Sequence, residues 1–310
     1  MNTIYTNQST RENLDLLYAQ AHIYDGVKSW NRLNLFLSVI LPVILSAAVA
    51  YNRSKGLLDT ELASSFLGVY GLLVLAFNIA LSSYASKQRR KAASIQEIYD
   101  CRVLGIRRNE LKVEEVAKDE ISRAASYFKH RPERADRRFG KEGWYVSKVY
   151  DAPQPVMALL CHGKNLGWDR SLRQILHWVY FCAVIIFPTG ILVYGIAMKS
   201  RLNEVLFYIV FILPLIRYFL LQFMDNLSSI KRSEKLKKYV EKELSNIKVS
   251  GRVDYDTLGY TLRNIQDEIF SYRASCPPAP NVFQRAMKFR NEQVYDDYFE
   301  LNLKELHLSD

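Results

Sequence analysis

The clearest pattern in the sequence is four long apolar blocks separated by strongly charged chain. The blocks are residues 33–51, 62–85, 175–198 and 205–224. Each is close to the ~20 residues that a helix needs to cross the ~30 Å hydrocarbon core of a bilayer. The first three contain no Asp, Glu, Lys or Arg, and the fourth contains only Arg217. Buried helices of a soluble bundle would each carry a polar stripe, which these blocks lack. The pattern therefore predicts an all-α membrane protein with four transmembrane helices.

Lysines and arginines set the predicted orientation of these helices. The short connections 52–61 and 199–204 pair the blocks into two hairpins and hold four Lys and Arg residues, whereas the other flanks hold fourteen. Those flanks are 25–32, 86–93, 164–174 and 225–238. Because cytoplasmic flanks are enriched in Lys and Arg, we expect a multi-pass protein of the bacterial inner (plasma) membrane with both termini in the cytoplasm.

The remaining chain is predicted to form mainly helical cytoplasmic regions. The expected organisation is an N-terminal amphipathic helix in 1–32, transmembrane hairpin 1 in 33–85, a cytoplasmic middle region in 86–174, transmembrane hairpin 2 in 175–224 and a helical C-terminal region in 225–310. Apolar residues recur at helical spacing in 113–128, 226–248 and 281–306. Strand signals are weak, and only 144–150 alternates well enough to suggest a short strand.

Overall charge and known motifs narrow the class of function. Basic residues beside membrane spans are attracted to anionic lipid headgroups, so the net charge of +10 requires no duplex nucleic acid as a partner. The four cysteines form no CxxC pair, and the chain lacks the GxSxG, HExxH and GxxxxGK[ST] motifs. We therefore expect a protein that is not an enzyme and that needs no metal or cofactor.

Several residues inside the apolar blocks are candidates for a pore or gate. Pro188 and Pro214 each remove a helix hydrogen bond and introduce a bend. Asn78 and Arg217 are polar side chains at membrane depth, where such residues usually face protein or water. Prolines are also common structural kinks in membrane helices, and Arg217 could extend toward the cytoplasmic headgroups instead of lining a pore. Both alternatives stay open at this stage.

A basic cluster in the middle region is the best candidate for binding an anionic ligand. Its members are Arg131, Arg134, Arg137, Arg138, Lys141 and Trp144. Arginine binds phosphate through two parallel hydrogen bonds, and an indole ring can stack on a nucleobase. A loop that rests on lipid headgroups, or a solvated turn, would show the same composition.

Three segments together resemble one family of membrane proteins. They are RENLDLLYAQAHIYDGVKSWN before the first block, CHGKNLGWDRSLRQIL before the third and PPAPNVFQRAMKFRNEQVYDDYF near the end. Their order and spacing resemble the bacterial four-transmembrane effectors associated with SMODS-type cyclic-oligonucleotide synthases. The positions that match are Asn165, Trp168, Asp169, Arg173 and Arg290.

The resemblance implies a pore-forming effector of a CBASS-type antiphage system. Such a protein would oligomerise in the bilayer and disrupt the inner membrane after a signal, either a cyclic oligonucleotide from a partner nucleotidyltransferase or a protein partner. The sequence also leaves two alternatives: a membrane-anchored signalling or scaffold protein that conducts nothing, and a small transporter, for which a faint similarity between the two hairpins is the support.

Overall fold

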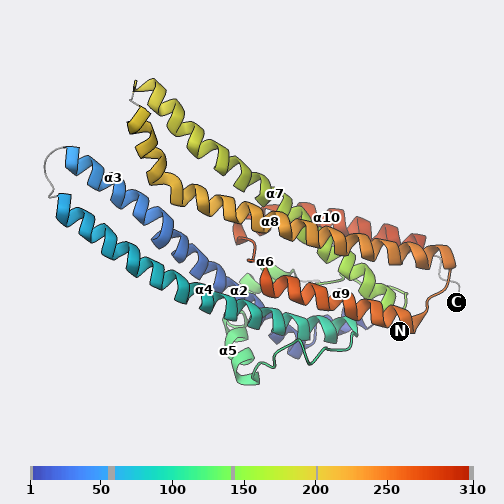
Figure 1. Ribbon diagram of the computed structural model, residues 1–310. Helices are drawn as coiled ribbons and strands as arrows, with labels where there is room; N and C mark the ends of the chain where they lie inside the picture. Colours follow the sequence, from blue (N-terminus) through green and yellow to red (C-terminus); the bar gives the residue numbers. More distant parts are fainter. Residues whose placement is uncertain (1–2, 55–59, 141–143, 200–201, 307–310) are drawn as a thin grey trace. The chain divides into compact units, whose positions relative to one another are not determined.

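The chain is a series of α-helices, several of them very long (Figure 1). A computed structural model describes residues 3–54, 60–140, 144–199 and 202–306. The helices are α1 (Ile4–Gln8), α2 (Arg11–Leu35), α3 (Leu41–Ser54), α4 (Thr60–Leu104), α5 (Lys118–Lys129), α6 (Pro132–Phe139), α7 (Gln154–Ala197), α8 (Leu202–Ser250), α9 (Tyr255–Ser275) and α10 (Asn281–Glu305), with a π-helical turn, η1 (Phe36–Ile40), between α2 and α3. The predicted all-α class is confirmed for these residues.

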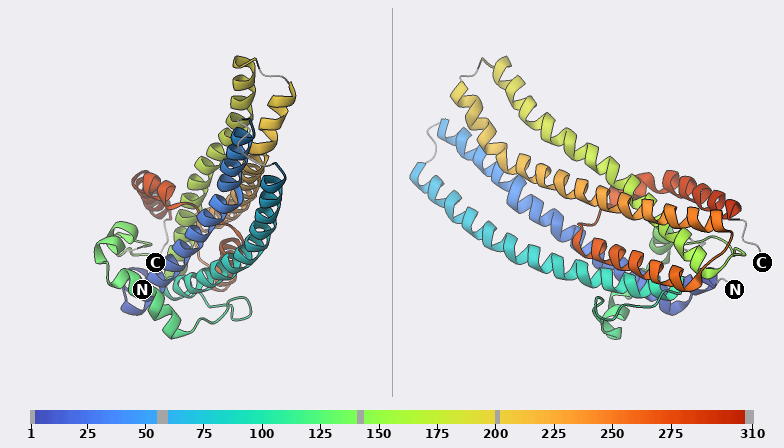
Figure 2. Two further views of the ribbon diagram at one scale, coloured as in Figure 1. Left: turned by 90° about the vertical axis from the view of Figure 1, so that its left-hand side faces the viewer. Right: turned by 45° about the vertical axis from the view of Figure 1, so that its right-hand side comes forward.

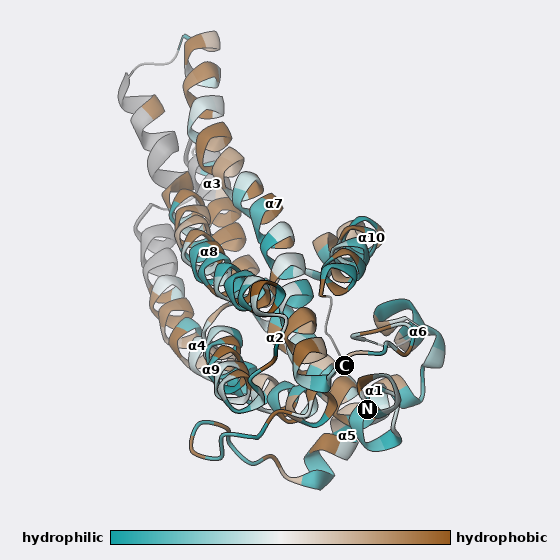
Figure 3. Cartoon of the chain, turned by 90° about the vertical axis from the view of Figure 1, so that its right-hand side faces the viewer, coloured by the Kyte–Doolittle hydropathy of each residue, from teal (hydrophilic) through white to brown (hydrophobic). Residues whose placement is uncertain are grey.

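Two compact units divide the chain. The first, called here the polar unit, comprises Met1–Val27, Ser86–Gln174 and Ser229–Asp310, and the second, the apolar unit, comprises Lys28–Ala85 and Ile175–Ser228. All four apolar blocks fall in the apolar unit. Figure 3 shows that α6, in the polar unit, is mostly hydrophilic and that the C-terminal part of α7, in the apolar unit, is mostly hydrophobic.

Large hydrophobic side chains of the apolar unit are exposed. Leu72, Ile79 and Ile196 are 69%, 66% and 78% exposed, respectively. Within the described residues, two helical stretches are long and apolar enough to cross a membrane, Val69–Leu104 and Gln154–Ala197; their apolar 18-residue windows have mean hydropathies of 1.5 and 2.1, respectively. Side chains of this kind cover the surface of a protein that contacts lipid rather than water.

The π-helical turn η1 has a cause in the sequence. Pro42 has no N–H group, and its ring would clash with the carbonyl four residues earlier in a regular α-helix. In η1 the backbone N–H of Leu41 bonds to the carbonyl of Phe36 instead. The carbonyl of Leu37 then accepts a hydrogen bond from the Tyr70 hydroxyl of α4 at 2.7 Å. The Tyr70 hydroxyl thus gives the Leu37 carbonyl a hydrogen-bond donor, which water could not supply in the core of a bilayer.

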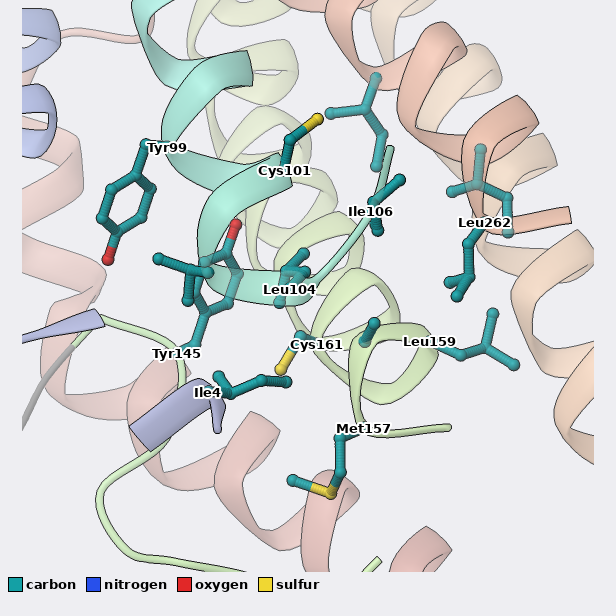
Figure 4. Packing of buried hydrophobic residues seen from close by; sticks show 14 of the residues in the cluster. Ile4, Tyr99, Cys101, Leu104, Ile106, Tyr145, Met157, Leu159, Cys161 and Leu262 are labelled. Atoms are coloured by element: carbon teal, nitrogen blue, oxygen red, sulfur yellow. The ribbon is translucent and has the colours of Figure 1, made fainter. Parts of the chain in front are cut away.

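The core of the polar unit is built from α4, α7, α8 and α9 together with the N-terminal residues, and α5 and α6 add further buried side chains. Figure 4 shows Tyr145, Cys161 and Met157 packed in one cluster, and all three are at most 1% exposed. Gly105, which has a φ of +72°, ends α4 in a backbone conformation that favours glycine.

In the polar unit, one candidate strand did not form and one predicted helix boundary was wrong. The segment 144–150 forms no strand, because the side chain of Gln8 takes the place of a partner strand. Its Oε1 accepts from the backbone N–H of Tyr145 at 2.9 Å, and its Nε2 donates to the carbonyl of Val146 at 2.6 Å. The helix expected from residue 113 starts at Lys118, since Ala117 is extended. Val113 is nevertheless buried, which explains the misleading periodicity.

Candidate ligand site and buried ionic network

The predicted basic cluster lies on and beside the short helix α6. Pro132 occupies the first turn, where its missing N–H has no cost, and Gly140 ends the helix with a φ of +79°. Arg131, Arg134 and Arg137 are exposed. Lys141 lies outside the described residues.

Two of these arginines converge on the ring of Tyr127, at the end of α5. The guanidinium carbon of Arg131 lies 4.4 Å from the ring centroid, and Nη1 of Arg134 donates to the Tyr127 hydroxyl at 2.7 Å. The imidazole of His22, from α2, stacks on the same ring with 4.7 Å between centroids. Burial lowers the pKa of His22; nearby Asp25 opposes this shift, and the positive charges of Arg131 and Arg138 add to it.

The other predicted members of the cluster have structural roles. Arg138 pairs with Asp25 of α2, so its guanidinium is already neutralised. Trp144 is half-buried and contacts Phe139 edge to face, with 5.9 Å between ring centroids. The sequence prediction missed Tyr127 and His22, although Tyr127 precedes Arg131 by four residues, which is the spacing that could have suggested a contact.

A buried ionic network lies in the core of the polar unit, where α9 runs beside α4 (Figure 2). Glu97 and Asp100 of α4 are 0% and 1% exposed. Arg263 of α9 donates to Glu97 at 2.6 Å, and Arg273 pairs with Asp100. Each acid is therefore neutralised by an arginine of the same helix, α9.

Neutral side chains complete this network. The amide of Gln266 donates to Glu97 at 2.6 Å and to Asp100 at 3.2 Å, and the Tyr145 hydroxyl donates to Asp100 at 2.6 Å. Burial raises the pKa of Glu97, while the hydrogen bond from Arg263 opposes that shift. This arrangement fastens α9 to α4.

His162 of α7 lies in the same region and is not ionised at neutral pH. It is 1% exposed, and burial lowers its pKa to about 4, against a small opposing effect of Asp100. Its Nε2 has no hydrogen-bond partner in the described part of the chain. A proton on this ring would therefore bring a buried positive charge close to Arg263 and Arg273.

Two of the family-like positions form a second polar cluster. Arg173 donates to Asp169 at 2.9 Å, one turn earlier on α7, and to the carbonyl of Pro277 at 3.5 Å. The Tyr272 hydroxyl also donates to Asp169. These contacts hold the linker between α9 and α10. Of the other matching positions, Asn165 and Trp168 are half-buried and Arg290 is exposed.

The pore and gate candidates of the apolar unit lie on three helices, α4, α7 and α8. Pro188 lies inside α7 and Pro214 inside α8. Arg217 is exposed and makes no hydrogen bond or ion pair with the described residues. Asn78 differs, because its amide joins the two helices of the first hairpin: its Oδ1 accepts from Asn34 at 3.3 Å, and its Nδ2 donates to Ser38 at 3.2 Å.

Similarity to known proteins supports the assignment made from the three segments. A family profile described as "SMODS-associating 4TM effector domain" matches residues 2–299. The chain is also 24% identical, over 267 residues that make up 86% of each protein, to a Bacillus cereus (strain VD146) protein named "Probable CBASS effector molecule IK1_05631". No solved structure gave a significant match.

Proposed function

The chain belongs to the family of SMODS-associating 4TM effectors, and we propose on this basis that it is a membrane effector of a CBASS-type antiphage system. On this view it oligomerises in the bacterial inner membrane and opens a pore, or otherwise breaks the permeability barrier, after a cyclic oligonucleotide reaches its polar unit. A partner nucleotidyltransferase would supply that ligand.

The observation that carries this function is the combination of two dissimilar units in one chain. The apolar unit exposes large aliphatic side chains along helices long enough to span a bilayer. The polar unit has its own hydrophobic core and presents unpaired basic side chains at its surface. A unit that binds a ligand and a unit that contacts lipid are the two parts that a triggered membrane effector needs.

The surface around Tyr127 has the chemistry to bind a cyclic oligonucleotide. Arg131 and Arg134 provide planar guanidinium groups suited to phosphate, and neither makes an ion pair with the described residues. Tyr127 and His22 provide aromatic rings next to these cations, as in sites where bases stack and phosphates pair at once. We therefore assign Arg131, Arg134, Tyr127 and His22 to the ligand site, with Arg137 at its edge.

Leakage from liposomes tests this function directly. The purified chain, reconstituted into dye-loaded vesicles, is expected to release dye when a cyclic oligonucleotide is added. In the double variant Arg131→Gln/Arg134→Gln, the ligand concentration for half-maximal dye release is expected to rise roughly tenfold to hundredfold for each arginine removed. The reason is that a hydrogen bond to a charged group contributes about 1.5–3 kcal/mol. Arg123→Gln is the matched control, because this arginine of the same unit is 78% exposed and lies on α5.

The same assay separates the alternatives. A membrane-anchored signalling or scaffold protein would release no dye under any ligand that binds it. Leakage that the double variant leaves unchanged would remove the Tyr127 surface from the site while retaining the membrane function. Arg217→Leu is expected to leave insertion intact, and changed leakage in this variant would assign the exposed face of α8 to the pore.

A further inference from the structure

The first eleven residues of α10 differ from the rest of that helix in a way that the ligand site does not explain. We propose that this segment, residues 281–291, binds the anionic headgroups of the membrane in which the chain is embedded. The inference requires only a membrane protein and depends on no activating ligand. It concerns an interaction surface of the polar unit with lipid.

Charge is distributed unevenly along α10. Residues 281–291 contain Arg285, Lys288 and Arg290 and no acid, whereas residues 292–305 contain five acids and one lysine. A helical segment with several cations and no acid is attracted to the negative surface potential of a bacterial or other anionic leaflet. The remainder of the helix would be repelled by the same surface.

Exposed apolar side chains accompany these cations. Val282 and Phe289 are 65% and 82% exposed, and they lie seven residues, or two helical turns, apart on one face. Arg285 lies between them and is exposed, as is Arg290. An aromatic and an aliphatic side chain on a basic helix face are typical of helices that lie in the headgroup region of a membrane.

The acidic half of α10 packs within the polar unit, where Phe299 is 3% exposed. Asp296 pairs with Lys164, Glu300 with Lys148 and Glu305 with Lys248. The rings of Tyr295 and Tyr298 lie against Gly167 and Gly163 of α7 so closely that a Cβ atom at Gly167 would lie 2.2 Å from Tyr295. The helix is therefore anchored through residues 295–305. Its basic half is also held at Asn281, Lys288 and Asn291, and these contacts leave Val282, Arg285, Phe289 and Arg290 exposed.

Contacts within the polar unit also fix where the basic half begins. Asn281 donates to Asp25 at 2.9 Å, and the carbonyl of Pro277 accepts from Arg173. Asp25 lies two residues before the polar-unit boundary at Val27, and Arg173 one residue before the boundary at Gln174. Both helices continue from there into apolar sequence, so the contacts of this segment lie within eight residues, along α2 and α7, of the predicted spans.

Lipid is a better partner for this segment than a second copy of the chain. The most acidic feature of α10 is its own second half, and four of its five acids, Glu292, Asp296, Glu300 and Glu305, are already paired with lysines. A second copy would therefore offer few free acids to the basic segment. Anionic headgroups carry free negative charge and are available at high density next to the spans.

Hydrogen exchange of the full chain in nanodiscs tests the inference. Peptides from 281–291 are expected to exchange roughly tenfold more slowly in nanodiscs that contain phosphatidylglycerol than in phosphatidylcholine alone. High salt should remove the difference, since it screens the headgroup charge. Peptides from 295–305 should be unaffected and act as an internal reference.

Matched variants on the same helix make the result specific. Arg285→Gln/Arg290→Gln is expected to abolish the effect of phosphatidylglycerol, whereas Lys304→Gln in the acidic half should retain it. Phe289→Ser should weaken the protection in both lipid mixtures, while Leu301→Ser, which alters a side chain that is 60% exposed, should not.

Two results would overturn the inference. One is equal exchange of 281–291 in both lipid mixtures; the other is protection that rises with the number of chains per nanodisc and not with anionic lipid, which would assign the face to a second copy. Because no cyclic oligonucleotide is present, failure here would leave the liposome test of the proposed function unaffected.

Discussion

The two units of the chain each contain a polar network between helices, buried in the polar unit and half-buried in the apolar unit, and the two networks differ in charge. In the polar unit, Glu97 and Asp100 are matched with Arg263 and Arg273. Among the described residues of the apolar unit, amide and hydroxyl groups join the first hairpin, through residues Asn34, Ser38, Asn78 and Ser82. Both networks connect helices that are distant in sequence.

The difference follows from the solvent around each unit. A unit whose outer surface faces water can hold an ion pair in its core, provided that each charge of the pair has its partner. At membrane depth a lone charge costs about 2.5–3.5 kcal/mol on insertion scales, whereas neutral groups still form useful hydrogen bonds between helices. The ionic network should therefore be the more sensitive of the two to the loss of a single partner.

The largest effect is expected when an arginine of the ionic network is removed. Arg273→Met leaves Asp100 buried at 1% exposure without its cation, and such a change costs about 3–5 kcal/mol. Chemical unfolding of the detergent-solubilised chain, followed by circular dichroism, measures the loss. A double variant, Asp100→Leu/Arg273→Met, should recover much of the stability, because no unpaired charge remains.

An exposed ion pair provides the control for this variant. Lys148 and Glu300 form a pair with side chains that are 59% and 42% exposed, and water screens such pairs strongly. Lys148→Met is expected to leave the unfolding midpoint nearly unchanged. Equal destabilisation by Lys148→Met and Arg273→Met would contradict the importance assigned to burial.

The contrast between the networks also explains what the sequence could and could not predict. The apolar blocks are local signals of about 20 residues, so the helical class was predicted correctly, and the order of three characteristic segments identified the family. The ionic network joins Asp100 to Arg273, 173 residues later, and no periodicity in either helix indicates that pairing. The role of Gln8 beside Tyr145 was missed for the same reason, since its partners lie 137 and 138 residues away.

The candidate ligand site shows the same limit on a smaller scale. The sequence identified the arginines of α6 as a group, because they are close in the chain. It did not show that Arg138 is paired with Asp25, 113 residues earlier, or that His22 stacks on Tyr127. The composition of the sequence locates a basic segment. Which of its arginines form ion pairs and which do not is decided by tertiary contacts.

A change in pH is expected to destabilise the polar unit through His162. Its pKa is about 4 in the folded chain against 6.5 without burial, so the unfolded chain takes up the proton first as the pH falls. The contribution of the neutral ring is fully present above pH 6.5 and is lost toward pH 4, by about 3 kcal/mol. Unfolding free energies of the wild-type chain and of His162→Gln across this range measure the effect.

The comparison with His162→Gln isolates this residue from the others. Glu97, whose pKa is raised by burial, acts in the opposite direction, because the folded chain takes up that proton more readily than the unfolded chain. This contribution is common to both proteins and cancels in the difference. A wild-type stability that falls no more steeply than that of His162→Gln would show that the ring gains a proton without cost.

The smallest effect is expected in the neutral network of the apolar unit. Asn78→Leu removes hydrogen bonds to Asn34 and Ser38, and such bonds between membrane helices contribute about 0.6 kcal/mol on average, with a maximum near 1.7. Ile79→Val, at a side chain that is 66% exposed, is the control on the next residue of the same helix. Unfolding in detergent should therefore distinguish Asn78→Leu from Ile79→Val by about 1 kcal/mol. If Asn78→Leu destabilised the chain as much as Arg273→Met, water or a charge would have to enter the first hairpin. The lack of charge in this network would then not explain a small loss of stability.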